Sequence, residues 1–192
     1  ALKAYQRLLE KWTTRINLIS KSTHDDVWVR HICDSAQVIA LASPHARHWV
    51  DIGSGGGLPG LVVAILAKEL NPQLRVTLIE SDQRKAVFLR TVVRELQLSA
   101  TVQAKRIEAV GPLKADIISA RALAELSDLL RMTHSFMGEN TQCVFMKGKN
   151  WSKEVKEAEK SWQFQAERFI SKTNHEAVIL SVRNVTGAPR SE

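Results

Sequence analysis

The segment from Asp51 to Gly60 reads DIGSGGGLPG and combines a carboxylate with five glycines and a proline. Glycine accepts positive φ and has no Cβ, so the backbone N–H groups of such a loop can approach a ligand closely. Pro59 suits the first turn of a following helix. The loop also satisfies the dinucleotide pattern G-x-G-x-x-G, a match that is weak when taken alone. These residues predict a cofactor-binding loop between a strand and a helix, with a glycine turn that binds nothing as the alternative.

Two carboxylates close to this loop favour a cationic ligand that carries a nucleoside. Asp51 precedes the glycines in D-x-G-x-G-x-G, which is similar to the first motif of Rossmann-like methyltransferases, and its charge suits a sulfonium better than a pyrophosphate. Glu80 ends the next apolar run, where a carboxylate can accept hydrogen bonds from both ribose hydroxyls. NAD sites use a carboxylate in the same way, so an NAD-linked oxidoreductase stays an alternative. We predict S-adenosyl-L-methionine as the cofactor, with Gly55 and Glu80 among its contacts.

The elements that must position these residues alternate between short apolar runs and amphipathic stretches after His48. The expected strands cover residues 48–53, 75–81, 100–105, 115–120, 142–147, 167–171 and 176–182, and the expected helices cover 61–70, 84–96, 125–136 and 153–162. Residues 1–43 are expected to be helical, with Leu8, Leu9, Trp12 and Ile16 on one helix and a second helix starting near Asp25. This order predicts an α/β fold of the Rossmann-like S-adenosylmethionine-dependent methyltransferase type, with a mostly parallel twisted sheet and helices on both faces. We expect a single domain with a helical leader (1–44), a core (45–185) and a flexible tail (186–192).

Further candidates follow the third and fourth expected strands, because ligands of such sheets bind at the carboxyl ends of the strands. Ile107 and Glu108 stand where an apolar and a polar side chain would bracket an adenine, although a surface loop is the simpler interpretation of this spacing. Arg121 stands where many methyltransferases place the target base, and a surface ion pair is its alternative role. The Asp/Asn-Pro-Pro-aromatic signature of exocyclic-amine methylation is absent from this segment, which argues against transfer to an adenine or cytosine amino group.

The composition favours a polyanionic partner and excludes several other classes of protein. The chain carries a net charge of +7, and its basic excess falls in residues 1–50 and 147–192. This distribution fits binding to RNA, and it equally fits a basic surface that has no such partner. Its longest apolar run, Leu61 to Ala67, is far short of a membrane span. Cys33 and Cys143 form neither a disulfide framework nor a metal site, so we expect a cytoplasmic protein without a metal.

Seven segments in order along the chain resemble the RsmG family, also called glucose-inhibited division protein B, of bacterial 16S rRNA methyltransferases. They are KWTTRINL (11–18), VRHICDS (29–35), DIGSGGGLPG (51–60), LIESDQRKAVFLR (78–90), AKRIEAV (104–110), ISARALAEL (118–126) and FMKGK (145–149). The leader motif combined with GLPG is far more specific than the glycines alone. The departures are mild: Ser54 in the loop, Ile107 before Glu108, and fewer N-terminal residues than is usual in the family.

The resemblance implies methylation of N7 of a guanosine in the decoding-region loop of 16S rRNA, on the RNA or on a small-subunit particle. It places the cofactor contacts on Gly53, Leu58, Ile107, Glu108 and Arg121. A ring nitrogen at position 7 already offers a lone pair, so no general base is expected, and catalysis would rest on proximity and alignment. We expect the protein to be a monomer that does not associate with a membrane.

Three further residues are candidates for contact with the RNA: Arg30, His31 and Lys147. A packing role for His31, with Asp34 as its partner, is an equal alternative, and Lys147 could simply end a strand. A small-molecule methyltransferase and a noncatalytic RNA-binding module also remain open at this point, because neither the loop nor the charge identifies the acceptor.

Overall fold

A seven-stranded sheet organises the computed structural model, which describes residues 1–20 and 26–187. Its strands are β1 (His48–Ile52), β2 (Arg75–Ile79), β3 (Ala100–Gln103), β4 (Ala115–Arg121), β5 (Met137–Lys147), β6 (Gln163–Ile170) and β7 (Val178–Thr186). The α-helices are α1 (Leu2–Thr13), α2 (Asp34–Ala36), α3 (Gly60–Leu70), α4 (Gln83–Glu95), α5 (Leu126–Thr133) and α6 (Trp151–Ala158). Every strand and helix expected after His48 is therefore present, within a few residues of its predicted bounds.

The strand order is β3-β2-β1-β4-β5-β7-β6, and the first five strands of this order are parallel. Only β7 and β6 run antiparallel to their neighbours, because a short turn joins them as a hairpin. The order reverses direction at β1, whose neighbours are β2 and β4. Ligands of open α/β sheets bind at such a reversal, beyond the carboxyl ends of the strands.

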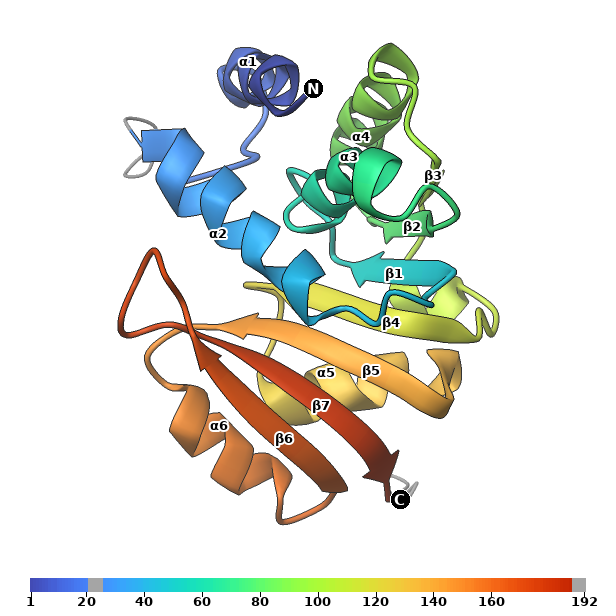
Figure 1. Ribbon diagram of the computed structural model, residues 1–192, viewed down its shortest axis with the longest axis vertical. Helices are drawn as coiled ribbons and strands as arrows, with labels where there is room; N and C mark the ends of the chain where they lie inside the picture. Colours follow the sequence, from blue (N-terminus) through green and yellow to red (C-terminus); the bar gives the residue numbers. More distant parts are fainter. Residues whose placement is uncertain (21–25, 188–192) are drawn as a thin grey trace.

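Both faces of the sheet are covered by helices (Figure 1). The alternation of side chains along β1 shows this directly, because Trp49 packs in one buried cluster while Val50 and Ile52 pack in the other. The Trp49 cluster includes residues of α1, α3 and α4, and the opposite cluster includes residues of α5 and α6. The predicted fold, a mostly parallel sheet with helices on both faces, is confirmed.

The leader differs from its expected form in two respects. Helix α1 ends at Thr13, so Ile16 lies beyond it; the hydroxyl groups of Thr13 and Thr14 donate to the carbonyls of Leu9 and Lys11, which satisfies acceptors of the last turn. The second leader helix is not a regular α-helix. It passes from a π-helical segment, η2 (Trp28–Cys33), through α2 to a 3-10 segment, η3 (Gln37–Leu41).

Two expectations for the ends of the leader and of the chain fall outside the described ranges. These are the helix start near Asp25 and residues 188–192 of the tail. In the part of the chain that the structure describes, no helix is both long and apolar enough to cross a membrane.

Candidate active site

The glycine loop joins β1 to α3 in a conformation that suits glycine at several positions. Gly53, Gly55 and Gly57 have φ values of 62°, 54° and 86°. A Cβ placed on Gly53 would lie 2.6 Å from Cδ1 of Leu123, so a side chain at this position would also have to displace that leucine. The loop therefore presents backbone rather than side chains toward the carboxyl end of the sheet, as the sequence predicted.

Glu80 ties this loop to the end of β2. Its Oε2 accepts a hydrogen bond from the backbone N–H of Gly55 at 2.8 Å, and its Oε1 accepts one from the N–H of Asp82 at 2.8 Å. The side chain is largely buried but still reaches the surface of the cleft described below. A carboxylate has about four lone-pair sites, so Glu80 can hold the loop and still accept a hydrogen bond from a ligand hydroxyl.

Asp51 lies beneath the loop, where it is fully buried. Its Oδ1 accepts a hydrogen bond from the Ser119 hydroxyl at 2.6 Å, and that hydroxyl accepts one from Nε1 of Trp49 at 2.7 Å. Burial raises the pKa of Asp51 to about 6, although the hydrogen bond from Ser119 opposes the rise. Asp51 does not line the cleft, and its predicted parts in orienting the loop and favouring a cationic cofactor stay predictions.

A leader residue that the sequence did not single out also holds the glycine loop. The hydroxyl of Tyr5, on α1, donates to the carbonyl of Gly56 at 2.6 Å, and the whole side chain is buried. Burial raises the pKa of Tyr5 above its usual value, so its proton is retained as a donor. The only signal in the sequence was that this is the single tyrosine of the chain, which says nothing about its partner.

A cleft of about 540 Å³ opens at the carboxyl ends of β1, β2, β3 and β4. The residues predicted to bind the cofactor all line it: Gly53, Gly55, Leu58, Glu80, Ile107, Glu108 and Arg121. Ile107 and Glu108 enter from a short 3-10 segment, η4 (Ile107–Ala109), where Ile107 is half-buried and Glu108 is exposed. The structure thus brings seven residues from four loops to one cleft of the size that small-molecule cofactors occupy.

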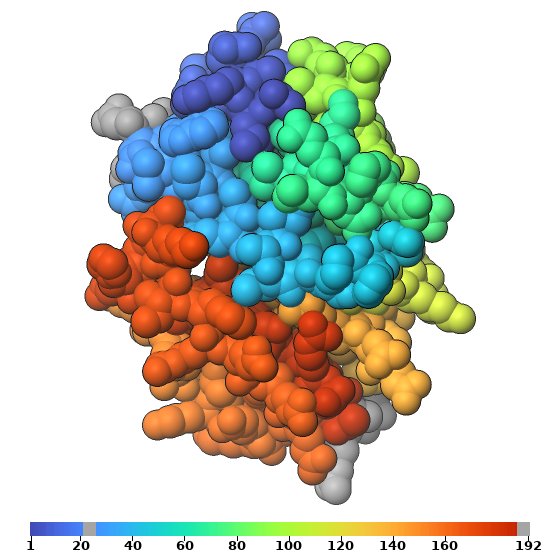
Figure 2. All heavy atoms as spheres, viewed as in Figure 1, coloured from blue at the N-terminus to red at the C-terminus, as the bar shows by residue number. Residues whose placement is uncertain are grey.

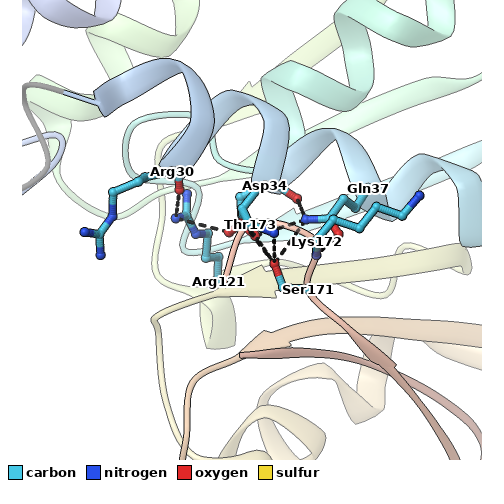
Figure 3. A network of polar contacts seen from close by, with 7 residues as sticks. All are labelled: Arg30, Asp34, Gln37, Arg121, Ser171, Lys172 and Thr173. Carbon is cyan, nitrogen blue, oxygen red and sulfur yellow. Dashed lines mark hydrogen bonds and ion pairs between the residues drawn. The ribbon is translucent and has the colours of Figure 1, made fainter. Parts of the chain in front are cut away.

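Arg121 forms one end of this cleft and is held by the leader. Its Nη2 donates to the carbonyl of Arg30 at 2.8 Å and lies 3.4 Å from Oδ2 of Asp34 (Figure 3). The side chains of Arg121 and Asp34 are only 19% and 14% exposed, so this pair is largely shielded from solvent. The ion pair anticipated as an alternative role is present, but it lies in the wall of a cleft rather than on the open surface.

Comparison with known proteins identifies the family. The family model described as rRNA small subunit methyltransferase G (GidB) matches residues 1–180. The chain belongs to this family. A ribosomal RNA small subunit methyltransferase G of Ruegeria sp. (strain TM1040) is 48% identical over 184 residues, which cover 96% of this chain and 89% of that protein. The protein of the same name from Parvibaculum lavamentivorans is 44% identical, over 97% of this chain and 83% of its own length. The resemblance drawn from the sequence is thereby confirmed.

Solved structures with low sequence identity share the fold. The P. horikoshii protein TYW2, in complex with MeSAdo, aligns with a TM-score of 0.63 at 14% identity, over 82% of this chain and 63% of that one. A mutant of MtNAS, in complex with S-adenosylmethionine, aligns with a TM-score of 0.63 at 17% identity, over 97% of this chain and 76% of that one. At these identities the likeness concerns the Rossmann-like architecture.

The three residues predicted to contact the RNA lie in different surroundings. Arg30 is exposed, and Figure 3 shows its guanidinium pointing away from the other labelled side chains. Lys147 is buried instead: its Nζ donates to the carbonyl of Ala124 at 2.7 Å and lies 2.5 Å from Oε2 of Glu154. The fold itself pairs this amine, which fits the alternative that Lys147 ends a strand with a structural partner, while its contact with the RNA stays a prediction.

His31 is also largely buried. It belongs to the leader and lines the cofactor cleft. Burial, and then the nearby charge of Arg121, lowers the pKa of His31 to about 4, so the imidazole is neutral at pH 7. Asp34 was expected as a partner of His31. Its Oδ1 accepts hydrogen bonds from Gln37, Ser171 and Thr173. Within the described ranges, no group of three or more His, Cys, Asp or Glu residues could hold a metal ion.

Proposed function

We propose that this chain transfers a methyl group from S-adenosylmethionine to N7 of a guanosine in the decoding-region loop of 16S rRNA. The observation that carries the proposal is the convergence of all seven predicted cofactor residues on one cleft, in a chain that belongs to the rRNA small subunit methyltransferase G family. The net charge of +7 suits a polyanionic substrate.

The residues of the cleft fit this cofactor by their chemistry. The loop from Gly53 to Gly55 offers backbone groups at positions where positive φ keeps side chains out. Glu80 supplies a carboxylate for the ribose hydroxyls, while Ile107 and Glu108 supply an apolar surface and a polar group for the adenine. When bound, the cofactor supplies an electrophilic methyl group on a sulfonium. Arg121 supplies a cation for its carboxylate or for the acceptor base.

The chain's own residues would then act by position rather than by proton transfer. Guanine N7 carries a lone pair in the neutral base, so no group has to remove a proton before attack. The histidine that lines the cleft, His31, is buried and has its pKa lowered to about 4, so it is not poised to titrate near neutral pH. We assign the rate acceleration to the alignment of the base with the methyl group and to the exclusion of water.

The test is transfer of a tritiated methyl group to undermethylated small-subunit rRNA, offered as naked RNA, as assembly intermediates and as mature subunits. We expect incorporation that maps to N7 of one guanosine. Absence of transfer to all three substrates would refute the proposal. Transfer to small molecules in the absence of RNA, or calorimetric binding of NAD but not of S-adenosylmethionine, would redirect it to the alternative enzyme classes.

A matched pair of glycine variants tests the assignment of the loop. Gly55→Val forces a β-branched residue into a positive φ within the loop, so we expect loss of S-adenosylmethionine binding in a folded chain. Gly111→Val is the control, because a Cβ at Gly111 meets nothing within 4 Å and this residue does not line the cleft. Equal cofactor binding by both variants would contradict the assignment.

A further inference from the structure

A second cleft, of about 530 Å³, opens beside the cofactor cleft. The two clefts share three residues, His31, Arg121 and Ala122, which form the wall between them. The far side of the second cleft is built by the end of β5, with Gly148, and by the β6–β7 turn, with Thr173 and Asn174. A ligand in the second cleft would therefore lie against the same arginine as a ligand in the first.

Three segments that are distant in sequence are joined at this wall by one carboxylate. Asp34, from the leader, pairs through Oδ2 with Arg121 at the end of β4. Its Oδ1 accepts hydrogen bonds from the hydroxyls of Ser171 and Thr173, at 2.8 and 2.7 Å, in the β6–β7 turn (Figure 3). Figure 2 shows the leader, in blue, and the orange-red segment around this turn meeting at the surface.

A neighbouring amide extends the same network along the leader. The backbone N–H of Lys172 donates to Oε1 of Gln37 at 2.8 Å, and Nε2 of Gln37 lies 3.2 Å from Oδ1 of Asp34. These bonds join the turn to the leader. Asp34, Gln37 and Lys172 do not line the cofactor cleft, so the network can hold Arg121 without touching the cofactor, although Asp34 itself lines the second cleft.

The charges around the second cleft suit guanine, which carries acceptors on one edge and donors on the other. Arg121 lies in the shared wall, and the exposed Arg30 also lines the cleft, so cations are available to O6 or to a phosphate. Asp26 is exposed in the same lining and can accept hydrogen bonds from the N–H groups of the opposite edge. Nη2 of Arg121 already donates to the carbonyl of Arg30, so a contact with the base would use its remaining N–H groups, and a single contact with O6 would leave N7 free.

We propose that the second cleft receives the target guanosine, unstacked from the RNA, and that Asp34 is a positioning residue that fixes Arg121 between the base and the cofactor. This inference rests on the proposed function. It adds the place of the acceptor nucleotide and gives the leader and the β6–β7 turn a part in substrate binding. A base that reaches a cleft of this depth has to leave its stack, as enzymes that modify bases commonly require.

Filling the second cleft provides the test. Gly148 lines this cleft but not the cofactor cleft, and a Cβ at Gly148 meets nothing within 4 Å, so Gly148→Trp adds bulk without a clash at its base. We expect unchanged S-adenosylmethionine binding by calorimetry and loss of methyl transfer to rRNA. Gly111→Trp is the matched control, since its Cβ also meets open space and it lines neither cleft; it should methylate as the wild type does.

A second variant tests the positioning role of Asp34. Asp34→Asn removes the charge that pairs with Arg121 and keeps the size of the side chain. We expect kcat of the folded protein for rRNA to fall by about 100-fold, the scale of a small misplacement of a reacting group, with cofactor affinity little changed. The unfolding midpoint should fall as well, because Arg121 loses its shielded counter-charge, so kcat of the folded fraction is the deciding measurement. A merely structural role would lower the unfolding midpoint and leave kcat of the folded fraction intact.

Normal methylation by Gly148→Trp, or loss of its cofactor binding, would overturn the proposal of a separate acceptor cleft. Unchanged kcat in Asp34→Asn would overturn the positioning role. In either case the wild-type protein would still methylate rRNA, whereas failure of the wild-type protein itself would refute the proposed function. The two failures are therefore distinguishable.

Discussion

Replacing Gly53 with Ala tests the geometry of the cofactor loop at its first glycine, which lines the cofactor cleft. The backbone of Gly53 has φ of 62°, and a Cβ on it would lie 2.6 Å from Cδ1 and 2.9 Å from Cδ2 of Leu123. Two separate costs follow from these numbers. One is the backbone strain of an L-residue in the left-handed region, and the other is the contact with the leucine.

The two costs have different sizes. The left-handed conformation costs a residue with a Cβ about 1–2 kcal/mol. Overpacking costs about 1–3 kcal/mol in a closed core, and the lower end applies here because Leu123 is 38% exposed and can move outward. We therefore expect Gly53→Ala to lower the free energy of unfolding by about 2–3 kcal/mol.

A double-mutant cycle with Leu123→Ala separates these contributions. Urea unfolding of the wild type, both single variants and the double variant gives the coupling between the two positions. We expect Gly53→Ala to cost only about 1–2 kcal/mol in the Leu123→Ala background, since the strain remains and the contact is gone. Calorimetry should show weaker S-adenosylmethionine binding in both variants that carry Gly53→Ala, because the loop backbone faces the cofactor cleft.

Two results would refute this reasoning. An equal cost of Gly53→Ala in both backgrounds would show that contact with Leu123 does not limit the position. A cost near zero in the wild-type background would contradict the positive φ of Gly53 itself, and with it the description of the loop as a backbone cradle.

Three further substitutions probe the buried supports of the site, each by urea unfolding. Tyr5→Phe removes the donor to the Gly56 carbonyl, so we expect a loss of about 1–3 kcal/mol; no loss would mean that water replaces the hydroxyl. For Asp51, the pKa is raised from 3.8 to about 6 in the folded state, so the native protein binds more protons than the unfolded chain between these values, and its stability falls as pH rises through this window. The fall should amount to about 3 kcal/mol and be missing from Asp51→Asn, while parallel pH profiles of the two proteins would contradict it. Lys147→Met leaves Glu154 without its buried counter-charge and should cost about 3 kcal/mol; a neutral effect would show that this ion pair does not stabilise the fold.

The local patterns of the sequence predicted most of the fold. Short apolar runs predicted the buried strands of the sheet, since a buried parallel strand needs a continuous apolar segment, whereas nothing in the sequence predicted the order of the strands or its reversal at β1. The ends of the leader helices were harder. Helix α1 stops at Thr13, although the pattern of apolar residues continues past that point to Ile16, so the pattern alone did not give the helix end.

The sequence predicted the residues that line the cofactor cleft, but not the residues that hold them in place. Motif and resemblance identified the residues that line the cofactor cleft, because their types are set by backbone geometry and ligand chemistry. Tyr5 and Ser171 escaped notice, and Asp34 was considered only as a partner of His31, since their contacts span 51, 137 and 87 residues of chain, which no local spacing encodes. Asp51 shows the converse: its residue type was informative, but its burial under the loop depends on how α3 covers β1.

The leader contacts both clefts, and this gives it a role beyond stability. Tyr5 holds the glycine loop through Gly56, on the cofactor side, while Asp34 holds Arg121, in the wall that the two clefts share. If the leader moved as a unit, the loop and the arginine would shift together, so cofactor geometry and acceptor geometry would change in step. A change confined to α1, such as Tyr5→Phe, should then affect methyl transfer through both the loop and Arg121. Combined with Asp34→Asn, it should give effects on kcat that are not additive.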